Sequence, residues 1–265
     1  LSLAGGEIVM ALDGDTSFDN NMVASIVRHF EDPKVPAVAG SLRVRNVWGS
    51  WVTAMQALEY LLSIHKSKIG LSERNLVNND SGAFGAFRRS FLVKIGGWNT
   101  HTAEDLDLTL RIKSYFKRHD LRIPFEPEAV GHTDAPATLS QFLMQRLRWD
   151  GDLFFLYIRK HNHNISPTLL GWRTFLMILL TGFFFQLVLP FIIFIYTLLA
   201  LFILPGKTLL FLFALIYLLY LLITLLMFAA MLVMVSDRPR QDMVLGLLVP
   251  LFPMFIVYLI SGVAE

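Results

Sequence analysis

Apolar and polar residues recur with two different periods along the first 173 residues, and these periods predict both strands and helices. Residues 8–12 form a short apolar run that ends in an acidic turn, as a buried strand of an α/β sheet does. Residues 20–30 carry apolar side chains at helical spacing and end at Asp32-Pro33, which stops a helix. Residues 35–45 are expected to be extended, and residues 48–69 to form a long amphipathic helix.

The same alternation continues to residue 160. Residues 78–82 are rich in turn-forming side chains and predict a loop, and residues 83–88 predict a short strand or a loop. A helix is expected from residue 102 to about residue 119, then a strand over residues 121–125 and a helix over residues 139–160. Strands that alternate with helices favour a partly parallel sheet flanked by helices.

A different pattern begins at residue 174. Residues 174–204 and 208–235 are almost continuously apolar, and Lys207 is the only charged residue between Thr174 and Ser236. Each segment is long enough to cross a hydrocarbon core, which needs about 20 residues. Residues 205–207 predict a tight turn, so the two segments are expected to form a transmembrane hairpin.

The composition agrees with a membrane protein, because 54% of the 265 residues are hydrophobic and the mean hydropathy is +0.53. Arg238, Arg240 and the basic residues of the first part are expected on the cytoplasmic side, and Lys207 on the other side. Residues 243–263 predict either an interfacial helix or a further membrane span. Pro250 and Pro253 interrupt this segment and favour the interfacial helix.

These patterns divide the chain into four regions: a cytoplasmic α/β part over residues 1–160, a juxtamembrane linker over residues 161–173, the transmembrane hairpin over residues 174–235, and a cytoplasmic loop with an interfacial or transmembrane helix over residues 236–265. The chain starts at Leu1 without a methionine and runs at once into an apolar strand, so it is expected to be part of a longer protein. The absence of cysteine excludes disulfides, a thiolate nucleophile and a cysteine-based zinc site.

Candidate chemistry starts with Asp13 and Asp15, which flank Gly14 at the end of the first predicted strand. Paired carboxylates there suit a divalent ion, Mg²⁺ or Mn²⁺, that takes its other ligands from water and a diphosphate. Gly14 allows a phosphate to approach the backbone closely. The alternative is a turn in which an aspartate caps the next element, and an isolated pair of this kind favours that alternative.

Glu104 and Asp105 open the helix predicted from residue 102. Thr102 and Asp105 have the spacing of a capping box, and acidic residues in a first turn suit the helix dipole. Asp105 equally suits a general base that takes a proton from an acceptor hydroxyl, and the two roles are compatible.

Gln145, Arg148 and Trp149 lie at helical spacing and present an amide, a guanidinium and an indole on one face. Arginine can bind a diphosphate with two hydrogen bonds, and tryptophan offers a flat face to a sugar ring. The alternative is a helix on the membrane surface with Arg and Trp at the headgroups, and Arg146 is assigned to that role. Several other side chains are expected to be structural or solvated: His132 as a hydrogen-bond partner, His161 and His163 in a solvated loop, and Trp48, Trp51 and Phe84 in the core or an interface.

Taken in order, these motifs resemble those of the processive family 2 glycosyltransferases, which make cellulose, chitin, hyaluronan and poly-N-acetylglucosamine. Asp13-Gly14-Asp15 matches the family's DxD motif, and Gln145 to Trp149 is a complete Q-x-x-R-W motif. Ala103-Glu104-Asp105 matches the T/E-D motif, with Ala103 in place of the usual threonine. Ser81-Gly82-Ala83-Phe84 and Gly96-Gly97-Trp98 look like the loop that meets the end of the growing polymer.

The resemblance implies an α/β GT-A-like domain, incomplete at its N-terminus, that is followed by α-helical transmembrane segments. It implies an inverting transfer from a UDP-sugar to a growing β-linked polysaccharide, with Mg²⁺ or Mn²⁺ as cofactor. The implied partners are the donor, the polysaccharide acceptor, the lipid bilayer and accessory export subunits, with no nucleic acid. By position, Asp15 would bind the metal, Asp13 and Arg148 the nucleotide-sugar and its diphosphate, and Asp105 would be the catalytic base, with Gln145, Trp149, Ser81 and Gly82 at the acceptor.

One part of the family pattern is missing, because the first strand–helix unit that grips the nucleotide should precede Leu1. Residues 81–88 favour N-acetylglucosamine as the sugar, and glucose stays open. A non-processive enzyme that adds one sugar to a lipid, and a non-catalytic membrane scaffold, are the alternatives. The Q-x-x-R-W motif favours polymer extension over the first, and the complete set of acidic motif positions argues against the second.

Overall fold

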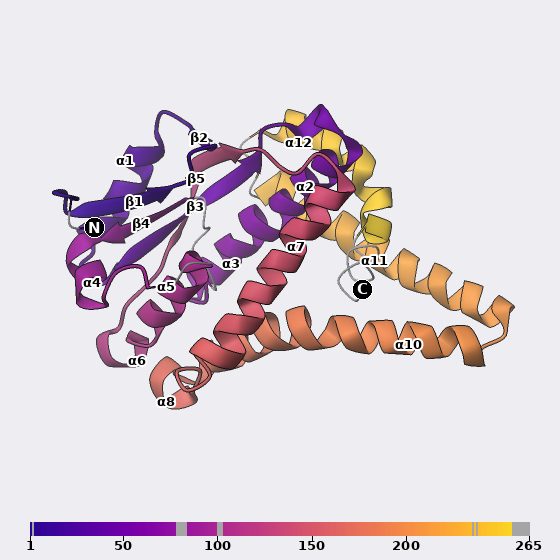
Figure 1. The fold of residues 1–265 in the computed structure, drawn as a ribbon. Helices are drawn as coiled ribbons and strands as arrows, with labels where there is room; N and C mark the ends of the chain where they lie inside the picture. The colour runs from indigo at the N-terminus through magenta and orange to yellow at the C-terminus, as the bar shows by residue number, and fades with distance from the viewer. Residues whose placement is uncertain (2, 78–83, 100–102, 235, 237, 256–265) are drawn as a thin grey trace.

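A computed structural model describes residues 1–265 except residues 2, 78–83, 100–102, 235, 237 and 256–265. A mixed sheet with helices on both faces occupies one end of the molecule, and two long helices, α10 and α11, project away from it side by side (Figure 1). The predicted organisation, an α/β part followed by apolar helices, is therefore the observed one.

Five strands form the sheet in the order β1-β4-β3-β5-β2. Their bounds are Ile8–Leu12 for β1, Ser17–Phe18 for β2, Ala37–Val44 for β3, Phe84–Arg88 for β4 and Phe125–Thr133 for β5. The β3–β5 pair is parallel and the other pairs are antiparallel. Strands β1, β3 and β5 consequently run in one direction, and the residues that follow them lie at the same edge of the sheet, where α/β proteins bind ligands.

Two apolar clusters sandwich the sheet because alternate residues of β3 point to opposite faces. Val38 and Leu42 join the cluster that includes α1, α2 and α7, whereas Ala37 and Ala39 join the cluster that includes α4 and α5. Gly40 has no side chain, and a Cβ there would lie 2.0 Å from the ring of Phe84. The close approach of β3 and β4 therefore depends on glycine at position 40.

The helices of the α/β part follow the predicted ranges with shifted ends. Their bounds are Met22–Val27 for α1 with a 3₁₀ turn over Arg28–Glu31, Trp51–Tyr60 for α2, Ser67–Glu73 for α3, Arg89–Lys94 for α4, Glu104–Lys113 for α5, Phe116–His119 for α6 and Leu139–Phe154 for α7. A 3₁₀ turn over Val47–Gly49 precedes α2, and π-helical turns extend α2 over Leu61–Lys66 and α7 over Phe155–Lys160. Ser50 forms the capping box that starts α2.

The strand predicted over residues 121–125 was wrong, because β5 begins only at Phe125. Asn75 binds the connecting backbone instead: its side chain donates to the carbonyl of Leu121 at 2.7 Å and accepts from the amide of Ile123 at 3.2 Å. These bonds satisfy the buried backbone without a strand partner. The N-cap of α5 is Ala103, in a left-handed conformation with φ of 44°, and Thr102, for which a capping box was predicted, lies outside the described residues.

Two continuous helices have the length and composition to cross a membrane, Trp172–Ile203 with a hydropathy of 2.5 and Gly206–Met234 with 2.8. The first contains α9 (Trp172–Met177), a π-helical stretch over Ile178–Val188 and α10 (Leu189–Ile203), and the second is α11. A short helix α8, Pro167–Leu170, precedes them. The turn between them is at Leu204-Pro205, and α11 begins at Gly206, two residues before the predicted start of the second segment at residue 208.

After α11 the chain returns to the α/β part as α12 (Pro239–Leu245) and a 3₁₀ turn over Gly246–Leu251, which contact α2 (Figure 1). Val249 and Leu245 are buried in the main cluster, and Phe255 stacks on Phe142 of α7 at 5.3 Å. The described part of the segment predicted over residues 243–263 therefore packs against the α/β part, and its remainder lies outside the described residues.

Candidate active site

The acidic turn after β1 lies at the carboxyl edge of the sheet, as predicted. Asp13, Gly14 and Asp15 are exposed, and the amide of Thr16 donates to the carbonyl of Asp13 at 3.2 Å to close the turn. Burial raises the pKa of Asp13, and the charges of Asp15 and Glu104 raise it further, whereas Arg148 lowers it. Side chains from β1, α5 and α7 are thus close enough to act on one carboxylate, although 91 and 135 residues separate Glu104 and Arg148 from Asp13 along the sequence.

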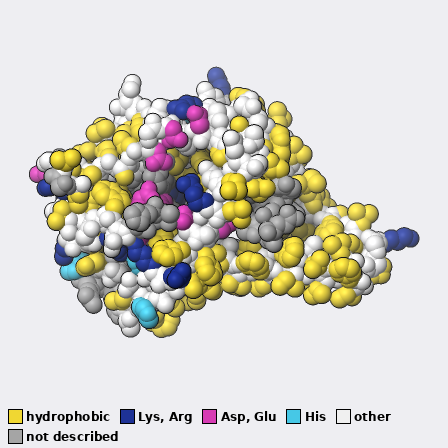
Figure 2. Space-filling view, viewed as in Figure 1, with side chains coloured by type: hydrophobic (Ala, Val, Ile, Leu, Met, Phe, Trp, Pro, Cys, Tyr) yellow, Lys and Arg dark blue, Asp and Glu magenta, His cyan; other side chains and the backbone are white. Residues whose placement is uncertain are grey.

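Charged side chains of both signs are also concentrated on one face of the molecule (Figure 2). Acidic side chains and Lys or Arg side chains gather around a hollow on the face where the sheet meets α7 (Figure 2). The negative charges beside Asp13 raise its pKa, and a bound cation would offset them, so the residues present fit a divalent ion. Within the described residues no three His, Asp or Glu side chains are grouped to hold a metal.

Asp105 lies in the first turn of α5 and is half-buried, next to the exposed Glu104. Burial raises its pKa, and the charge of Glu104 acts in the same direction, whereas the amide of Leu106 and the charge of Lys68 lower it. A carboxylate with a raised pKa accepts a proton more readily than a free aspartate, which suits a general base. The left-handed backbone of Ala103 immediately before this turn is a strained conformation of the kind that clusters at functional sites.

Asp107, two residues further along α5, has a different environment. Its side chain is fully buried and lies 2.7 Å from His161, 2.8 Å from Lys160 and 2.8 Å from Arg111. Burial opposes ionisation, but the hydrogen bonds from His161 and Lys160 and the charge of Arg111 outweigh it and hold the pKa at about 2. The group ties α5 to the end of the α7 helix. The prediction of a solvated loop was therefore wrong for His161, which is buried.

Helix α7 carries Gln145, Arg148 and Trp149, and it is capped by Thr138, whose hydroxyl accepts a hydrogen bond from the amide of Gln141. Arg148 is exposed, and Trp149 retains 38% of its surface. The Oε1 atom of Gln145 is buried without a hydrogen-bond partner among the described residues, so it has an acceptor to offer. The roles predicted for these three side chains remain predictions, and they are part of the function proposed below.

Arg146 does not face lipid headgroups, and the prediction for it was wrong. Its guanidinium binds both carboxylate oxygens of Glu59 in α2, at 2.9 and 2.7 Å, and lies over the rings of Phe142 and Trp149 at 4.8 and 4.6 Å. Arg146 therefore holds α7 against α2 and covers one face of Trp149.

Replacement of Glu59 by glutamine is expected to lower the free energy of unfolding by about 1.5–3 kcal/mol, because Arg146 keeps its largely buried charge and loses a charged partner. Thermal or denaturant unfolding of the purified protein measures the change. Glu73→Gln is the matched control, since Glu73 is exposed and has no ion pair within the described residues. Equal stability of the two variants would contradict the assignment.

The remaining predicted residues have mixed outcomes. Ser81 and Gly82 lie outside the described residues. His132 is structural, as expected, with Nε2 at 3.1 Å from Asp19. Phe84 is in the core, whereas Trp48 and Trp51 keep 66% and 59% of their surface exposed.

Sequence reasoning missed Arg45, at the end of β3. Its guanidinium binds Asp134, which follows β5, at 3.0 and 2.6 Å, and that hydrogen bond and the charge of Asp15 raise its pKa. Arg45 is therefore a neighbour of the acidic turn. The spacing of residues along the sequence does not indicate that Arg45 lies near the acidic turn, because this proximity follows from the order of the strands in the sheet.

Comparison with known proteins gives three findings. The family described as glycosyl transferase family group 2 matches residues 8–249. Poly-β-1,6-N-acetyl-D-glucosamine synthase of Staphylococcus aureus is 33% identical over 147 residues, which are 55% of this chain and 35% of the relative, and that of Staphylococcus epidermidis is 32% identical over 148 residues. The chain thus spans about a third of the length of these curated relatives.

The third finding is structural. A mannosyltransferase from Pyrobaculum calidifontis, PcManGT, solved in complex with GDP-Man and Mn²⁺, aligns with a TM-score of 0.55 and 16% identity. The alignment covers 99% of this chain and 61% of the other. At this identity the likeness shows a shared GT-A-like fold, which confirms the predicted fold class of the α/β part.

Proposed function

Since this chain belongs to glycosyl transferase family group 2 and is of the poly-N-acetylglucosamine synthase type, we propose that it transfers a sugar from a UDP-sugar to a growing β-linked polysaccharide at a membrane. The favoured sugar is N-acetylglucosamine, because the curated relatives are poly-β-1,6-N-acetyl-D-glucosamine synthases. One observation carries the proposal: the charges of Asp15, Glu104 and Arg148, from three separate elements, act together on Asp13.

Donor binding is assigned to the acidic turn and to α7. Asp15, with Asp13 beside it, would hold a divalent ion, Mg²⁺ or Mn²⁺, and the ion when bound offsets the charge of the donor's diphosphate. Mn²⁺ accompanies GDP-Man in the structural neighbour, which supports this cofactor class. Asp13 orients the nucleotide-sugar, and Arg148 binds the diphosphate and stabilises the charge that develops as it leaves.

The acceptor side is assigned to Asp105, Gln145 and Trp149. Trp149 stacks on the terminal sugar with its exposed part, and the buried oxygen of Gln145 accepts a hydrogen bond that shapes the acceptor site. Asp105 takes the proton of the acceptor hydroxyl as that oxygen attacks the anomeric carbon from the side opposite the diphosphate. The new C–O bond forms as the bond to the diphosphate breaks, so the configuration at the anomeric carbon inverts.

The membrane arrangement is part of the proposal. Helices Trp172–Ile203 and Gly206–Met234 cross the bilayer as a hairpin, and they expose nearly all their apolar side chains, with 11% and 6% of their most apolar windows buried. Residues 1–160 form the cytoplasmic catalytic part, residues 161–173 the linker, and residues 236–265 return on the cytoplasmic side. Export subunits that accept the polymer fit this arrangement as partners.

Removal of divalent metal from the full-length protein is expected to lower sugar transfer by at least about a hundredfold, because the diphosphate would leave without charge compensation. Transfer from a panel of UDP-sugars is measured before and after chelation, and Mn²⁺ or Mg²⁺ is then added back. Ca²⁺ serves as the control, since its longer bonds and higher ligand number fit a two-carboxylate site poorly. Full transfer in the chelated protein would contradict the proposed metal site.

The same assay separates the alternatives by product and donor. Long chains from UDP-N-acetylglucosamine support the proposal, whereas single additions to a lipid indicate the non-processive alternative and chains from UDP-glucose a glucan synthase. Absence of transfer from every donor would indicate a non-catalytic protein.

A further inference from the structure

The segment that follows α11 contacts the sheet through charged side chains. Asp242 of α12 binds both terminal nitrogens of Arg43 in β3, at 2.8 and 3.2 Å, and their side chains are only 3% and 10% exposed. Ser236 donates from its hydroxyl to Asp242 at 2.6 Å. The first residues after the second apolar helix are therefore held against the third strand of the sheet.

A second contact reaches the acidic turn. Arg238 donates to one carboxylate oxygen of Asp19 at 3.0 Å, and His132 of β5 lies 3.1 Å from the other oxygen. Asp19 comes four residues after Asp15, and its amide donates to the carbonyl of Val130 at 3.1 Å. Asp19 directly follows β2, the short strand that continues from the turn and pairs with β5, and Arg238 is one of the groups that hold this end of β2.

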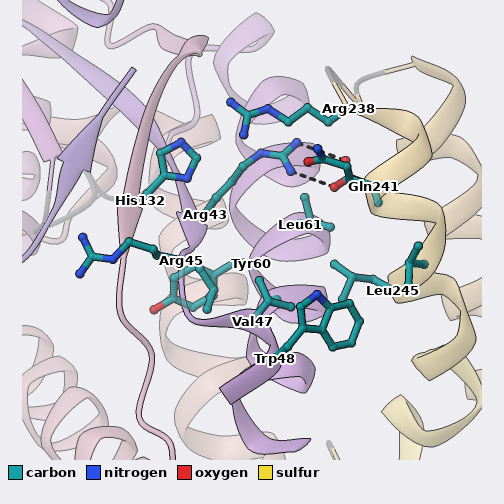
Figure 3. Close-up of a pocket in the computed structure, with 14 residues that line it drawn as sticks. Arg43, Arg45, Val47, Trp48, Tyr60, Leu61, His132, Arg238, Gln241 and Leu245 are labelled. Carbon is teal, nitrogen blue, oxygen red and sulfur yellow. Dashed lines mark hydrogen bonds and ion pairs between the residues drawn. The ribbon is translucent and has the colours of Figure 1, made fainter. Parts of the chain in front are cut away.

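The start of α12 contacts the sheet through polar side chains, whereas Leu245 and Val249 further along pack in the main apolar cluster. A cavity of about 490 Å³ lies between β3, β5 and α12 and is lined by the side chains of Arg43, His132 and Arg238 among others. Figure 3 shows these three side chains on the side of the cavity toward the strands, with Gln241 and Leu245 of α12 across from them. Arg238 connects the start of α12 to Asp19, whereas Asp242 connects α12 to β3, so a displacement of the start of α12 is transmitted to Asp19 through the Arg238 ion pair.

We propose that Arg238 is a positioning residue for the Asp13–Asp15 turn: by holding Asp19, it ties the inner end of α11 to the turn that would hold the divalent ion. This inference rests on the proposed function, in which the Asp13–Asp15 turn holds the divalent ion. Arg238 lies four residues after the last residue of α11, so a shift of that helix end moves Asp19 and with it the turn. The position of the membrane hairpin is thereby coupled to the affinity of the donor site.

Arg238→Ala in the full-length protein is expected to weaken Mn²⁺ binding by about two- to fivefold, as the loss of a partly exposed ion pair predicts. Free Mn²⁺ is measured by electron paramagnetic resonance in the presence of UDP, without any turnover. The KM for the donor should rise by a similar factor while kcat changes little, because ground-state and transition-state binding are lost together. Arg238→Lys should keep most of the affinity.

Two comparisons make the test specific. Arg240→Ala removes the same charge from an exposed position two residues away, with no ion pair within the described residues, and should leave Mn²⁺ affinity unchanged. Asp19→Asn should weaken binding as Arg238→Ala does, and the double variant should be no weaker than the single ones, because both remove one interaction.

Equal Mn²⁺ affinity in Arg238→Ala and Arg240→Ala would overturn the inference, and so would additive effects of Arg238→Ala and Asp19→Asn. A change confined to thermal stability would also overturn it. The proposed function fails separately, if the wild-type protein binds Mn²⁺ with UDP but transfers no sugar. A wild-type protein that does not bind Mn²⁺ with UDP would overturn both.

Discussion

Asp105→Asn is expected to lower kcat for sugar transfer by about 10²- to 10⁴-fold, because asparagine keeps the shape of the side chain and cannot accept the proton. The free energy of unfolding should stay equal or rise. Burial raises the pKa of Asp105 above its ordinary value of 3.8, so the ionised carboxylate costs stability in the folded protein and a neutral amide removes that cost. Initial rates of the full-length protein and a thermal unfolding curve measure the two quantities.

The pH dependence provides an independent check on Asp105. A base with a raised pKa loses activity as pH falls through that pKa, so the acidic limb of kcat/KM should have its midpoint above 3.8. This limb should be absent from the residual activity of Asp105→Asn. A variant that keeps more than about a tenth of wild-type activity would sink the assignment of the base, since it predicts at least a hundredfold loss.

Asp107→Asn, two residues away on the same helix, is expected to lower stability, unlike Asp105→Asn. The free energy of unfolding should fall by about 3–5 kcal/mol. The substitution leaves the charges of Lys160 and Arg111, and the ring of His161, packed around a neutral amide. It also releases the end of α7 from α5. Denaturant unfolding of the purified protein measures the loss.

Asp107 has a pH signature of its own. Its folded pKa of about 2 is below the ordinary 3.8, so the ion pairs contribute stability that is fully present above pH 3.8 and is lost as pH falls toward 2. The difference corresponds to about 2.5 kcal/mol at neutral pH. Asp152→Asn on α7 is the control, because Asp152 has no ion pair within the described residues. Equal unfolding curves for the two variants would show that the buried cluster is not structural.

Local patterns predicted most elements of the fold. The apolar run before Asp13, the helical spacing through Trp149 and the two uncharged stretches over residues 174–204 and 208–235 each depend on neighbours in sequence, and each formed a strand or a helix as expected. The errors in the elements arose where tertiary contacts replaced local ones. Asn75 satisfies the backbone at Leu121 and Ile123, which the apolar pattern alone assigned to a strand.

Polar side chains were harder to place from the sequence. His161 and Arg146 were assigned to solvent and to the membrane surface, but both are held inside the protein by carboxylates that lie 54 and 87 residues away. Arg45 was overlooked for the same reason, since its partner Asp134 belongs to another strand. Burial of a charge depends on whether an opposite charge arrives beside it, and no local period carries that information.

The sequence by itself determined the chemistry of this protein: two carboxylates after a strand, an acid pair at a helix start, an arginine–tryptophan pair on a third element, and two helices apolar enough for a bilayer. The residue types and their spacing within single elements were sufficient for this. Only the tertiary structure decided that the charges of Glu104 and Arg148 act on Asp13, that Asp107 is fully buried in an ion cluster while Asp105 is only half-buried, and that Arg238 reaches Asp19. These outcomes depend on strand order and on helices packed across the sheet, because electrostatic interactions follow distance in space and not along the chain.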